Sequence, residues 1–267
     1  MKKWVQVLLP VMLFVTVLDF CVFAVVTYQT AQTVGVQDGR RTVVIDPGHG
    51  GEDGGATGVG GAAEAALNLE ISLRLRDMLR LGGIDPLLIR ETDTAVYSSG
   101  CRTISEKKVS DIRNRTQTVN DTPDALLVSI HQNFFSEGKY RGAQVFCAKT
   151  DGSRQLAEQM QKNLSQYLDP ANHRQPKTAD GVYLMEHITC PGILIECGFL
   201  SNADEEQLLQ QPDYQKKMAA AIPPAEAVSP PVKAPRKPFS AAAFSTPLAS
   251  VLPKPVSGTL APAPAHS

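Results

Sequence analysis

Two histidines and two glutamates have the side-chain types and the sequence surroundings of a metal-assisted hydrolytic site. His49 and His131 each follow an apolar run of strand length. Glu64 begins an amphipathic stretch, and Glu196 lies inside an apolar run. A catalytic zinc takes three protein ligands, with two histidines and one glutamate as an established set, and leaves one position open for water. A further carboxylate can act as a general base towards that water. The four residues therefore suit zinc-assisted hydrolysis if the fold brings them together.

Each of these residues also has a plainer interpretation. A single histidine at the end of a strand is more often a hydrogen-bonded core residue than a metal ligand. Glu64 fits an acid in the first turn of a helix, where it complements the helix dipole. Glu196 resists such an explanation, because an unpaired carboxylate inside an apolar run is costly to bury. The joint placement of all four residues favours a functional site over four separate structural roles.

Residues 41–221 contain the alternating pattern that must position these side chains. Short apolar runs rich in Val, Ile or Leu predict strands, and amphipathic stretches between them predict helices. This alternation indicates an α/β fold with a mostly parallel sheet flanked by helices on both faces. In such a sheet, functional side chains gather where the strands end. The predicted strands are Thr42–Ile45, Pro86–Arg90, Ala125–Ile130, Ala143–Ala148 and Ile193–Cys197, and the predicted helices are Glu64–Leu81, Val109–Val119, Ser153–Leu168 and Ala203–Ala220.

Eight glycines between Gly48 and Gly61 let the backbone turn sharply and keep the predicted site accessible. One stretch of this loop, Gly58–Ala63, matches the dinucleotide-binding pattern G-x-G-x-x-A. The predicted strand ends well before this pattern, so the strand–turn–helix context of a dinucleotide site is missing. The P-loop pattern G-x-x-x-x-G-K-[ST] does not occur in the sequence. The glycines therefore do not indicate nucleotide binding.

The overall composition argues against nucleic-acid binding. The chain has 267 residues, 26 Lys+Arg against 27 Asp+Glu, and a formal net charge of −1. It has no global basic field to attract a polyanion, and aromatic residues at 6% offer few stacking platforms. Five cysteines are too few for a disulfide scaffold, and the sequence leaves open whether any of them pair.

Both ends of the chain differ in composition from the central part. Lys2 and Lys3 precede the apolar run Val5–Val26, which is long enough to cross a bilayer as a helix. Residues 1–30 therefore predict a membrane signal anchor, with a cleaved secretory signal as the alternative. In both cases the domain that follows is exported. Residues 222–267 hold most of the prolines and predict a Pro/Ala-rich disordered tail.

Four segments containing the candidate residues form a series in the sequence. They are VVIDPGHGG at 43–51, EAALNL at 64–69, VSIHQN at 128–133 and IECGFLSN at 195–202. Together they resemble the zinc-dependent N-acetylmuramoyl-L-alanine amidases of the amidase-3 family, over residues 41–221. The resemblance implies that His49, Glu64 and His131 are the zinc ligands and that Glu196 is the catalytic glutamate.

The same resemblance implies a substrate. The family cleaves the amide between the lactyl group of N-acetylmuramic acid and the first L-Ala of the peptidoglycan stem. The small size and the N-terminal anchor are similar to the sporulation-associated branch, which acts on spore cortex. A vegetative role in the cell wall and an activating protein partner stay open. The alternatives are a non-catalytic peptidoglycan-binding protein and a zinc peptidase that cuts within the stem peptide.

A few residues depart from the family pattern or add to it. Gln132 stands beside a predicted zinc ligand where a small residue is usual, and we expect it to narrow the site. Cys197 replaces an aliphatic or small residue, and we expect a buried hydrophobe rather than a redox group. Arg115 is expected to be a structural ion-pair partner rather than a substrate contact. His187 is expected to lie in a loop, with substrate contact as the less favoured alternative. The last helix passes directly into Pro223, a departure at the C-terminal edge and not at the four site residues.

Overall fold

Six strands form one sheet within residues 41–222, the part of the chain that this computed structural model describes. Their order across the sheet is β2-β1-β3-β6-β4-β5. β2, β1, β3 and β6 are parallel, whereas β4 is antiparallel to β6 and parallel to β5. The predicted α/β fold with a mostly parallel sheet is therefore confirmed. The strands are β1 (Thr42–Pro47), β2 (Leu87–Leu88), β3 (Ala125–Asn133), β4 (Gln144–Cys147), β5 (Lys177–Thr178) and β6 (Gly192–Phe199).

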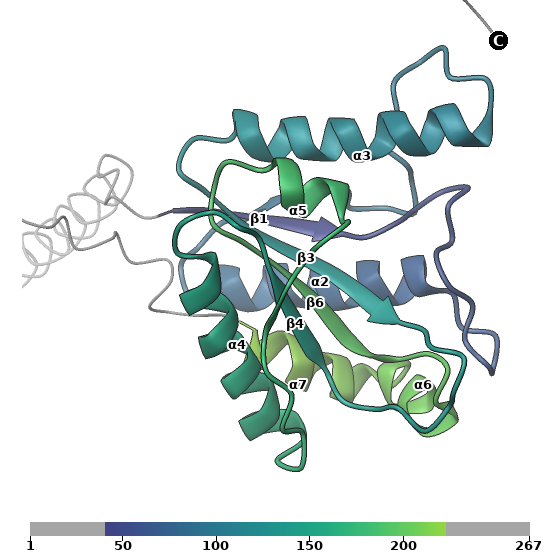
Figure 1. Cartoon of the computed structure of the whole chain (residues 1–267), viewed down its shortest axis with the longest axis vertical. Helices are drawn as coiled ribbons and strands as arrows, with labels where there is room; N and C mark the ends of the chain where they lie inside the picture. Colours follow the sequence, from purple (N-terminus) through teal and green to yellow (C-terminus); the bar gives the residue numbers. More distant parts are fainter. Residues whose placement is uncertain (1–40, 223–267) are drawn as a thin grey trace, which may run out of the picture. The chain divides into compact units, whose positions relative to one another are not determined.

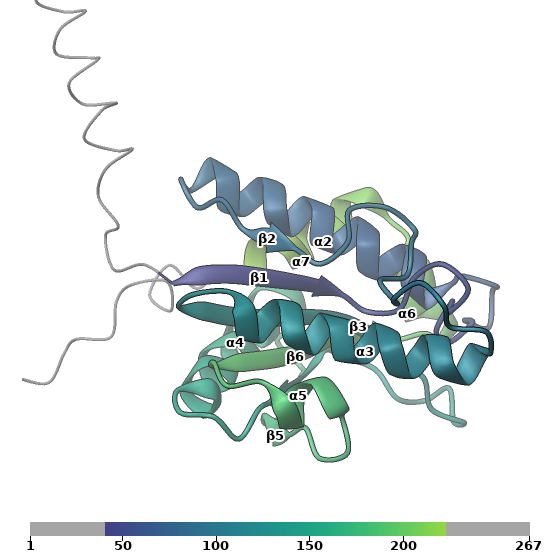
Figure 2. The ribbon, with the colours of Figure 1, turned by 90° about the horizontal axis from the view of Figure 1, so that it is seen from above.

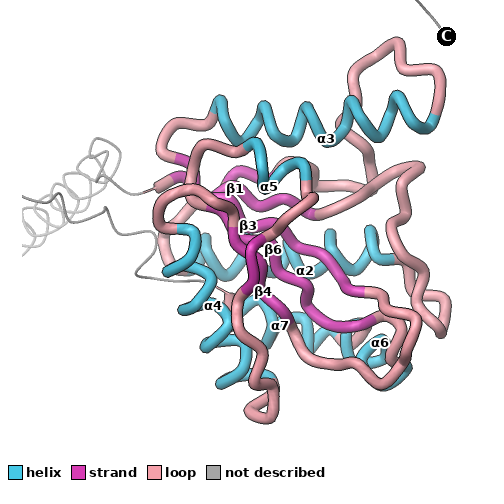
Figure 3. Tube along the Cα trace, in the orientation of Figure 1, coloured by secondary structure: helices cyan, strands magenta, loops and turns pink. Residues whose placement is uncertain are grey.

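Helices cover both faces of this sheet, as Figures 1 and 2 show. On one face, α2 packs against α7, and α7 packs against α4. On the other face, α3 and α5 lie together. Figure 3 shows the strands as a magenta layer between these cyan helices. The helices are α2 (Glu64–Leu81), α3 (Ile104–Asp121), α4 (Ser153–Leu168), α5 (Tyr183–His187), α6 (Ala203–Leu209) and α7 (Pro212–Ala221).

The strands divide their side chains between two hydrophobic cores. In β1, Val43 and Ile45 enter the core beneath α2, whereas Val44 enters the core beneath α3. This alternation follows from the period of two in a strand, where successive side chains point to opposite faces. All three valine and isoleucine side chains are buried, as expected for a strand covered on both faces. The same alternation decides which polar residues of β3 and β6 face α3.

The predicted helix Ala203–Ala220 is wrong in one respect, because the structure divides it into α6 and α7. Pro212 has no N–H group to donate, and it disfavours helical geometry in the residue before it. Gln211 accordingly adopts an extended conformation, with φ −79° and ψ 123°, and Pro212 begins a new helix. Met218, Ala219 and Ile222 are buried, so the C-terminal edge of the described chain is packed.

Helix α3 begins earlier than the predicted Val109–Val119. Thr103 and Glu106 form a capping box, in which each side chain accepts a hydrogen bond from the backbone N–H of the other residue. This box satisfies donors of the first turn and extends the helix back to Ile104. The extra turns carry Lys107 and Lys108, which lie near the site described below.

Two predictions concern residues that the structure does not describe. The signal anchor at 1–30 lies outside residues 41–222, and so does the tail after Ile222. Within the described range, no helix combines the length and the apolar character needed to cross a membrane.

Candidate active site

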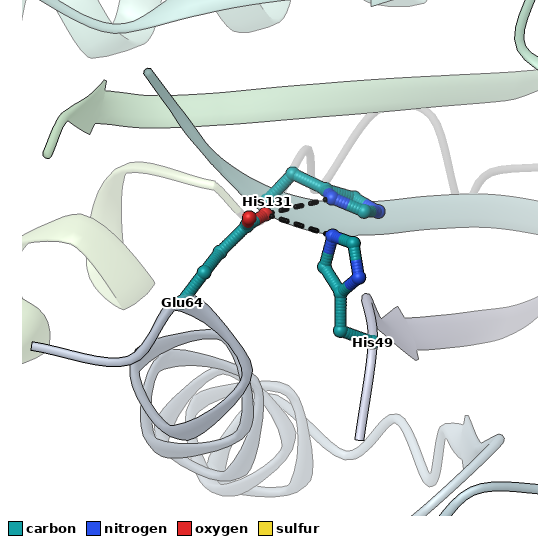
Figure 4. A group of neighbouring side chains, drawn as sticks. All are labelled: His49, Glu64 and His131. Atoms are coloured by element: carbon teal, nitrogen blue, oxygen red, sulfur yellow. Dashed lines mark hydrogen bonds and ion pairs between the residues drawn. The ribbon is translucent and has the colours of Figure 1, made fainter. Parts of the chain in front are cut away.

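The predicted metal ligands converge at the carboxyl ends of β1 and β3. These strands are parallel neighbours, with Pro47 opposite Ile130. His49 follows the last residue of β1 closely, His131 lies near the end of β3, and Glu64 is the first residue of α2. One ligand atom from each residue lies within 4.8 Å of those from the other two. Figure 4 shows the two imidazole rings directed towards the Glu64 carboxylate.

The three side chains contact one another directly. Oε1 of Glu64 lies 3.0 Å from Nδ1 of His131 and 3.3 Å from Nε2 of His49. Two imidazole nitrogens and one carboxylate oxygen are the donor set of an established class of catalytic zinc site. The three residues therefore fit a zinc ion, because their donor atoms are of suitable types and lie close together.

Glu64 is buried, but its carboxylate keeps its charge. Burial by itself would raise its pKa, and the hydrogen bonds and charges of His131 and His49 more than offset this effect. The net result is a pKa of Glu64 well below the usual range. Burial lowers the pKa of His49, whereas its contacts with Glu64 and Asp53 raise it, and the net value is about 9. The site therefore attracts positive charge.

Asp53 holds the opposite side of the His49 ring. Its Oδ2 lies 2.9 Å from Nδ1 of His49, so Nε2 is left to face Glu64. Metal-binding histidines commonly donate their second ring nitrogen to a carboxylate, which fixes the ring and its tautomer. The other oxygen of Asp53 lies 3.0 Å from Nζ of Lys108, on α3. Asp53 thus links the ring to a helix on the far side of the loop.

Glycine is required at two positions of the loop, because the side chains of His131 and Glu64 approach the backbone closely there. A Cβ on Gly48 would lie 2.2 Å from Nε2 of His131. A Cβ on Gly55 would lie 2.6 Å from Oε2 of Glu64, and Gly55 also has a positive φ of 68°. Glycine is the residue that permits both the approach and the backbone angle. Gly48 and Gly55 therefore belong to the site, whereas a Cβ on Gly54 or Gly61 would meet no atom within 4 Å.

Two buried arginines hold the backbone of the loop that carries His49. Arg90 donates to the carbonyl oxygens of Pro47 and Gly48, and Arg115 donates to those of Pro47 and His49. His49 itself has a left-handed φ of 61°, which is uncommon for a residue with a side chain. The two guanidinium groups thereby fix a conformation that the local sequence alone does not favour.

Arg115 also forms a buried ion pair beneath the loop. Its Nη1 lies 2.6 Å from Oδ1 of Asp46, and Oγ of Ser129 donates to Oδ2 of the same carboxylate at 2.7 Å. Burial would raise the pKa of Asp46, but the charge of Arg115 leads the opposing effects, and the net pKa is lowered. The prediction that Arg115 is a structural ion-pair partner is confirmed.

Glu196 lies beside His131 on the neighbouring strand. The two residues are paired in register between the parallel strands β3 and β6, so both side chains leave the sheet on the face covered by α3. Oε2 of Glu196 is buried and has no hydrogen-bond partner among the described residues. Burial raises the pKa of Glu196 to about 7, with smaller effects from the charges of His131, Glu64 and His49. A carboxylate with this pKa is suited to proton transfer near neutral pH.

A cavity of about 250 Å³ opens over these residues between the sheet and α3. His49, His131 and Glu196 contribute to its wall, so all but Glu64 of the predicted site residues line it. Lys107 and Lys108 lie on its α3 side. Apolar side chains complete the wall, among them Tyr97, Ile112, Val182, Leu184 and Leu194. The cavity offers both a reactive end and a surface for a partly apolar substrate.

The structure places Gln132 away from this cavity. Successive strand residues face opposite sides, so Gln132 lies under α2 while His131 faces α3. The expectation that Gln132 narrows the site is therefore wrong. Cys197 is buried as predicted, and burial raises the pKa of its thiol far above the usual range. The four cysteines within residues 41–222 are free: Cys101, Cys147, Cys190 and Cys197.

Some residues of the site were not singled out by the sequence. In addition, His187 lies on a helix and not in the predicted loop. Asp53 and Arg90 have polar side chains in loops and no distinguishing pattern around them. Their roles depend on contacts made only in the fold. His187, on α5, stacks on Tyr183 and its Nδ1 contacts the Tyr183 carbonyl, and it is not part of the cavity wall.

Comparison with known proteins gives consistent similarities. A family model described as N-acetylmuramoyl-L-alanine amidase (Amidase_3) matches residues 43–228. The germination-specific N-acetylmuramoyl-L-alanine amidase of Bacillus subtilis (strain 168) is 39% identical over 183 residues, which cover 68% of this chain and 76% of that protein.

Solved structures are similar as well. One is the CwlD amidase from Clostridioides difficile in complex with the GerS lipoprotein. It has a TM-score of 0.66 and 36% identity, and the match covers 71% of this chain and 95% of that one. Another is an N-acetylmuramoyl-L-alanine amidase from Clostridium difficile 630, with a TM-score of 0.60 and 30% identity, covering 69% and 93% of the two chains.

Proposed function

The chain belongs to the N-acetylmuramoyl-L-alanine amidase family, and from this premise we propose that it hydrolyses the muramoyl–L-Ala amide of peptidoglycan as a zinc-dependent enzyme. In this proposal His49, Glu64 and His131 bind the zinc ion, and Glu196 is the catalytic base. One observation carries the assignment. Three candidate ligand atoms within 4.8 Å of one another lie next to Glu196, whose buried Oε2 has no hydrogen-bond partner among residues 41–222.

Bound by these three residues, a zinc ion would polarise the amide carbonyl and lower the pKa of a coordinated water. The chain's own residues do the rest of the chemistry. Glu196 accepts a proton from the attacking water, because its carboxylate has a free oxygen and a pKa near 7. Glu196 then donates that proton to the nitrogen of the departing L-Ala. The products are a lactyl carboxylic acid on the glycan and a stem peptide with a free amino terminus.

The cavity wall suits the peptide part of the substrate. Stem peptides carry free carboxylates, and Lys107 and Lys108 place two ammonium groups on the α3 side of the cavity. Arg115 also reaches this cavity, but it is buried and already donates to Asp46, Asp111 and two carbonyl groups. Lys107 and Lys108 also pair with acids, Glu52 and Asp53, but their side chains are partly exposed, whereas that of Arg115 is buried. We infer that the two lysines, rather than Arg115, contact the peptide.

The biological setting is proposed from the relatives and from the sequence. Similarity to a germination-specific amidase supports a role on spore-cortex peptidoglycan. Its peptidoglycan substrate lies outside the cytoplasmic membrane, which agrees with the exported, anchored protein that residues 1–30 predict. The related Clostridioides difficile amidase was solved with a lipoprotein partner, and a protein partner for this chain stays a prediction. Comparing hydrolysis of cortex and vegetative peptidoglycan would separate the two roles.

Product analysis tests the proposed reaction. The purified protein should release stem peptides with a free L-Ala amino terminus from muropeptides. Chelation of the metal should abolish the release, and added zinc should restore it. Mass spectrometry distinguishes the alternatives. A peptidase leaves part of the peptide on the glycan, and a non-catalytic binding protein retains peptidoglycan without releasing any peptide. Release that persists after complete metal removal would overturn the zinc mechanism.

A further inference from the structure

A buried polar network lies behind Glu64, on the side away from the cavity. It consists of Asn68, which follows Glu64 by one helical turn on α2, and Gln132, which follows His131 on β3. Asn68 is fully buried and Gln132 is 4% exposed. Neither side chain contributes to the cavity wall. The network therefore has no direct access to a substrate, yet it touches two segments that carry proposed ligands.

Asn68 connects the backbone before His49 with the side chain of Glu64 through its amide nitrogen. Nδ2 donates to the carbonyl oxygen of Gly48 at 3.2 Å and to Oε1 of Glu64 at 3.4 Å. Gly48 immediately precedes His49, so one amide group contacts the backbone before one proposed ligand and the carboxylate of another. This arrangement requires that the nitrogen, and not the oxygen, of the amide points towards the site.

Gln132 adds a hydrogen bond that stabilises this orientation of the Asn68 amide. Its Nε2 donates to Oδ1 of Asn68 at 3.1 Å. A side-chain amide can exchange its oxygen and nitrogen by turning over, and only its hydrogen-bond partners distinguish the two orientations. In the turned orientation, Oδ1 of Asn68 would face the Gly48 carbonyl oxygen and the Glu64 carboxylate. All three oxygen atoms are acceptors, and no donor would lie between them. The hydrogen bond from Gln132 favours the productive orientation.

We propose that Gln132 is a positioning residue of the metal site, which acts through Asn68 to fix the Glu64 carboxylate and the backbone before His49. The inference rests on the metal-binding role proposed above for Glu64 and His49. The backbone N–H of Gln132 also donates to Oε1 of Glu64, at 3.2 Å. The same residue thus contacts the proposed ligand directly through its backbone and indirectly through its side chain.

The buried environment makes a glutamine at this position costly. Oε1 of Gln132 has no hydrogen-bond partner among residues 41–222. An unpaired amide oxygen is unfavourable in a protein interior, where an apolar side chain of the same size would avoid the cost. Packing alone therefore does not explain a glutamine at this position. The hydrogen bond that its Nε2 atom donates to Oδ1 of Asn68 explains it.

The direct test measures zinc affinity by competition with a chelating indicator, using the whole protein. Gln132→Met keeps the length of the side chain and removes its donor. We expect zinc affinity to fall about 10- to 100-fold, the usual effect of removing an outer-shell partner of a metal ligand. Gln215→Met is the matched control. Gln215 is also buried with an unpaired Oε1, but its Nε2 donates to Glu70 and Leu209. This control should keep wild-type zinc affinity even if it loses stability.

A double-mutant cycle tests the route through Asn68. In an Asn68→Leu background, Gln132→Met should cause no further loss of zinc affinity, because its target is gone. Additive losses would show that Gln132 does not act through Asn68. If Gln132→Met does not fold, Gln132→Leu replaces it, since it also removes the donor to Oδ1 of Asn68 and introduces no charge beside Glu64. Its zinc affinity should fall to a similar extent.

The outcomes separate this inference from the proposed function. Equal zinc affinity in the wild type and in the folded Gln132 variant would overturn the role of Gln132 alone. An equal loss in the Gln215→Met control would overturn it as well, because the effect would then follow from general destabilisation. Failure of the wild-type protein to bind zinc would instead overturn the metal site itself.

Discussion

Nδ1 of His49 lies 2.9 Å from Oδ2 of Asp53, although both residues belong to a glycine-rich loop rather than to a helix or strand. This contact directs Nε2 of the ring towards Glu64. It also gives the loop a fixed internal geometry, because the backbone of Gly50 and that of Asp53 donate to each other's carbonyl groups. The ring of the proposed ligand His49 is therefore held in its orientation by the protein alone.

Removing this carboxylate should weaken metal binding. In Asp53→Ala, the His49 ring loses the partner that fixes its orientation, and we expect zinc affinity to fall about 10- to 100-fold. Glu52→Ala is the matched control. Each variant loses one acid that pairs with a lysine of α3, but Glu52 pairs with Lys107 and does not contact His49. Equal affinities for the two variants, measured by chelator competition, would contradict the role of Asp53.

The proposed base can be separated from the ligands by substitution. Glu196→Gln keeps the shape of the side chain and removes its ability to accept a proton. We expect kcat to fall about 10²- to 10⁴-fold, the usual contribution of general acid–base catalysis, while zinc content stays at the wild-type level. Glu186→Gln, a change at an exposed position of α5, should leave both quantities unchanged. A zinc-free Glu196→Gln protein would place Glu196 among the ligands instead.

The close approach of Gly48 to His131 predicts a strong effect of a single methyl group. Gly48→Ala would place Cβ 2.2 Å from Nε2 of the imidazole, so the ring must leave its position. We expect loss of zinc binding and of activity in a protein that still folds. Gly54→Ala is the control in the same loop, because its Cβ meets no atom within 4 Å. Calorimetric zinc titration of both variants, with circular dichroism as the folding check, gives the comparison.

The buried pair of Asp46 and Arg115 should make stability depend on pH in the acid range. The pKa of Asp46 is lowered in the folded state, so its ionised form stabilises the fold. That contribution is complete above the unfolded pKa of about 3.9, and it is lost as the pH falls through the lower folded value. Urea unfolding of the wild type should therefore show this decline at acid pH, and Asp46→Asn should lack this component.

Replacing Arg115, the other member of this pair, should lower the free energy of unfolding more than replacing Asp46. Arg115→Met leaves the Asp46 carboxylate buried without its counter-charge, which costs about 3–5 kcal/mol when a buried pair loses one member. It also removes the donors to the carbonyl groups of Pro47 and His49. Unfolding free energy at pH 7 measures the effect. A loss below about 1 kcal/mol, typical of an exposed ion pair, would contradict the structural role of Arg115.

The sequence predicted the parts of the fold that depend on local periodicity. The bounds of α2 and α4 agree with the predicted Glu64–Leu81 and Ser153–Leu168, because each has a continuous amphipathic pattern. The convergence of His49, Glu64 and His131 follows from their places at strand ends and at a helix start. The pairing of Glu196 with His131 needed the strand order, which puts β6 next to β3.

Other parts of the fold and of the candidate site could not be predicted from local patterns in the sequence. The short elements β5 and α5 have too few residues for a periodic pattern. The contacts of Arg90 and Asp53 arise from loop conformations and from chain segments distant in sequence. Gln132 is a different case. The alternation of side chains along a strand already places it on the face opposite His131, so its direction could have been deduced from β3 alone.

The position of β6 imposes an order on the formation of the enzyme. It is the last strand of the sheet in the sequence, but it lies between β3 and β4. A growing chain can pair β1 with β3 while residues 192–199 are still to be made, and such distant pairings form more slowly than local ones. The proposed ligands thus come from segments synthesised early, whereas Glu196 arrives with the strand that closes the sheet. The proposed hydrolytic site is therefore incomplete until β6 lies between β3 and β4.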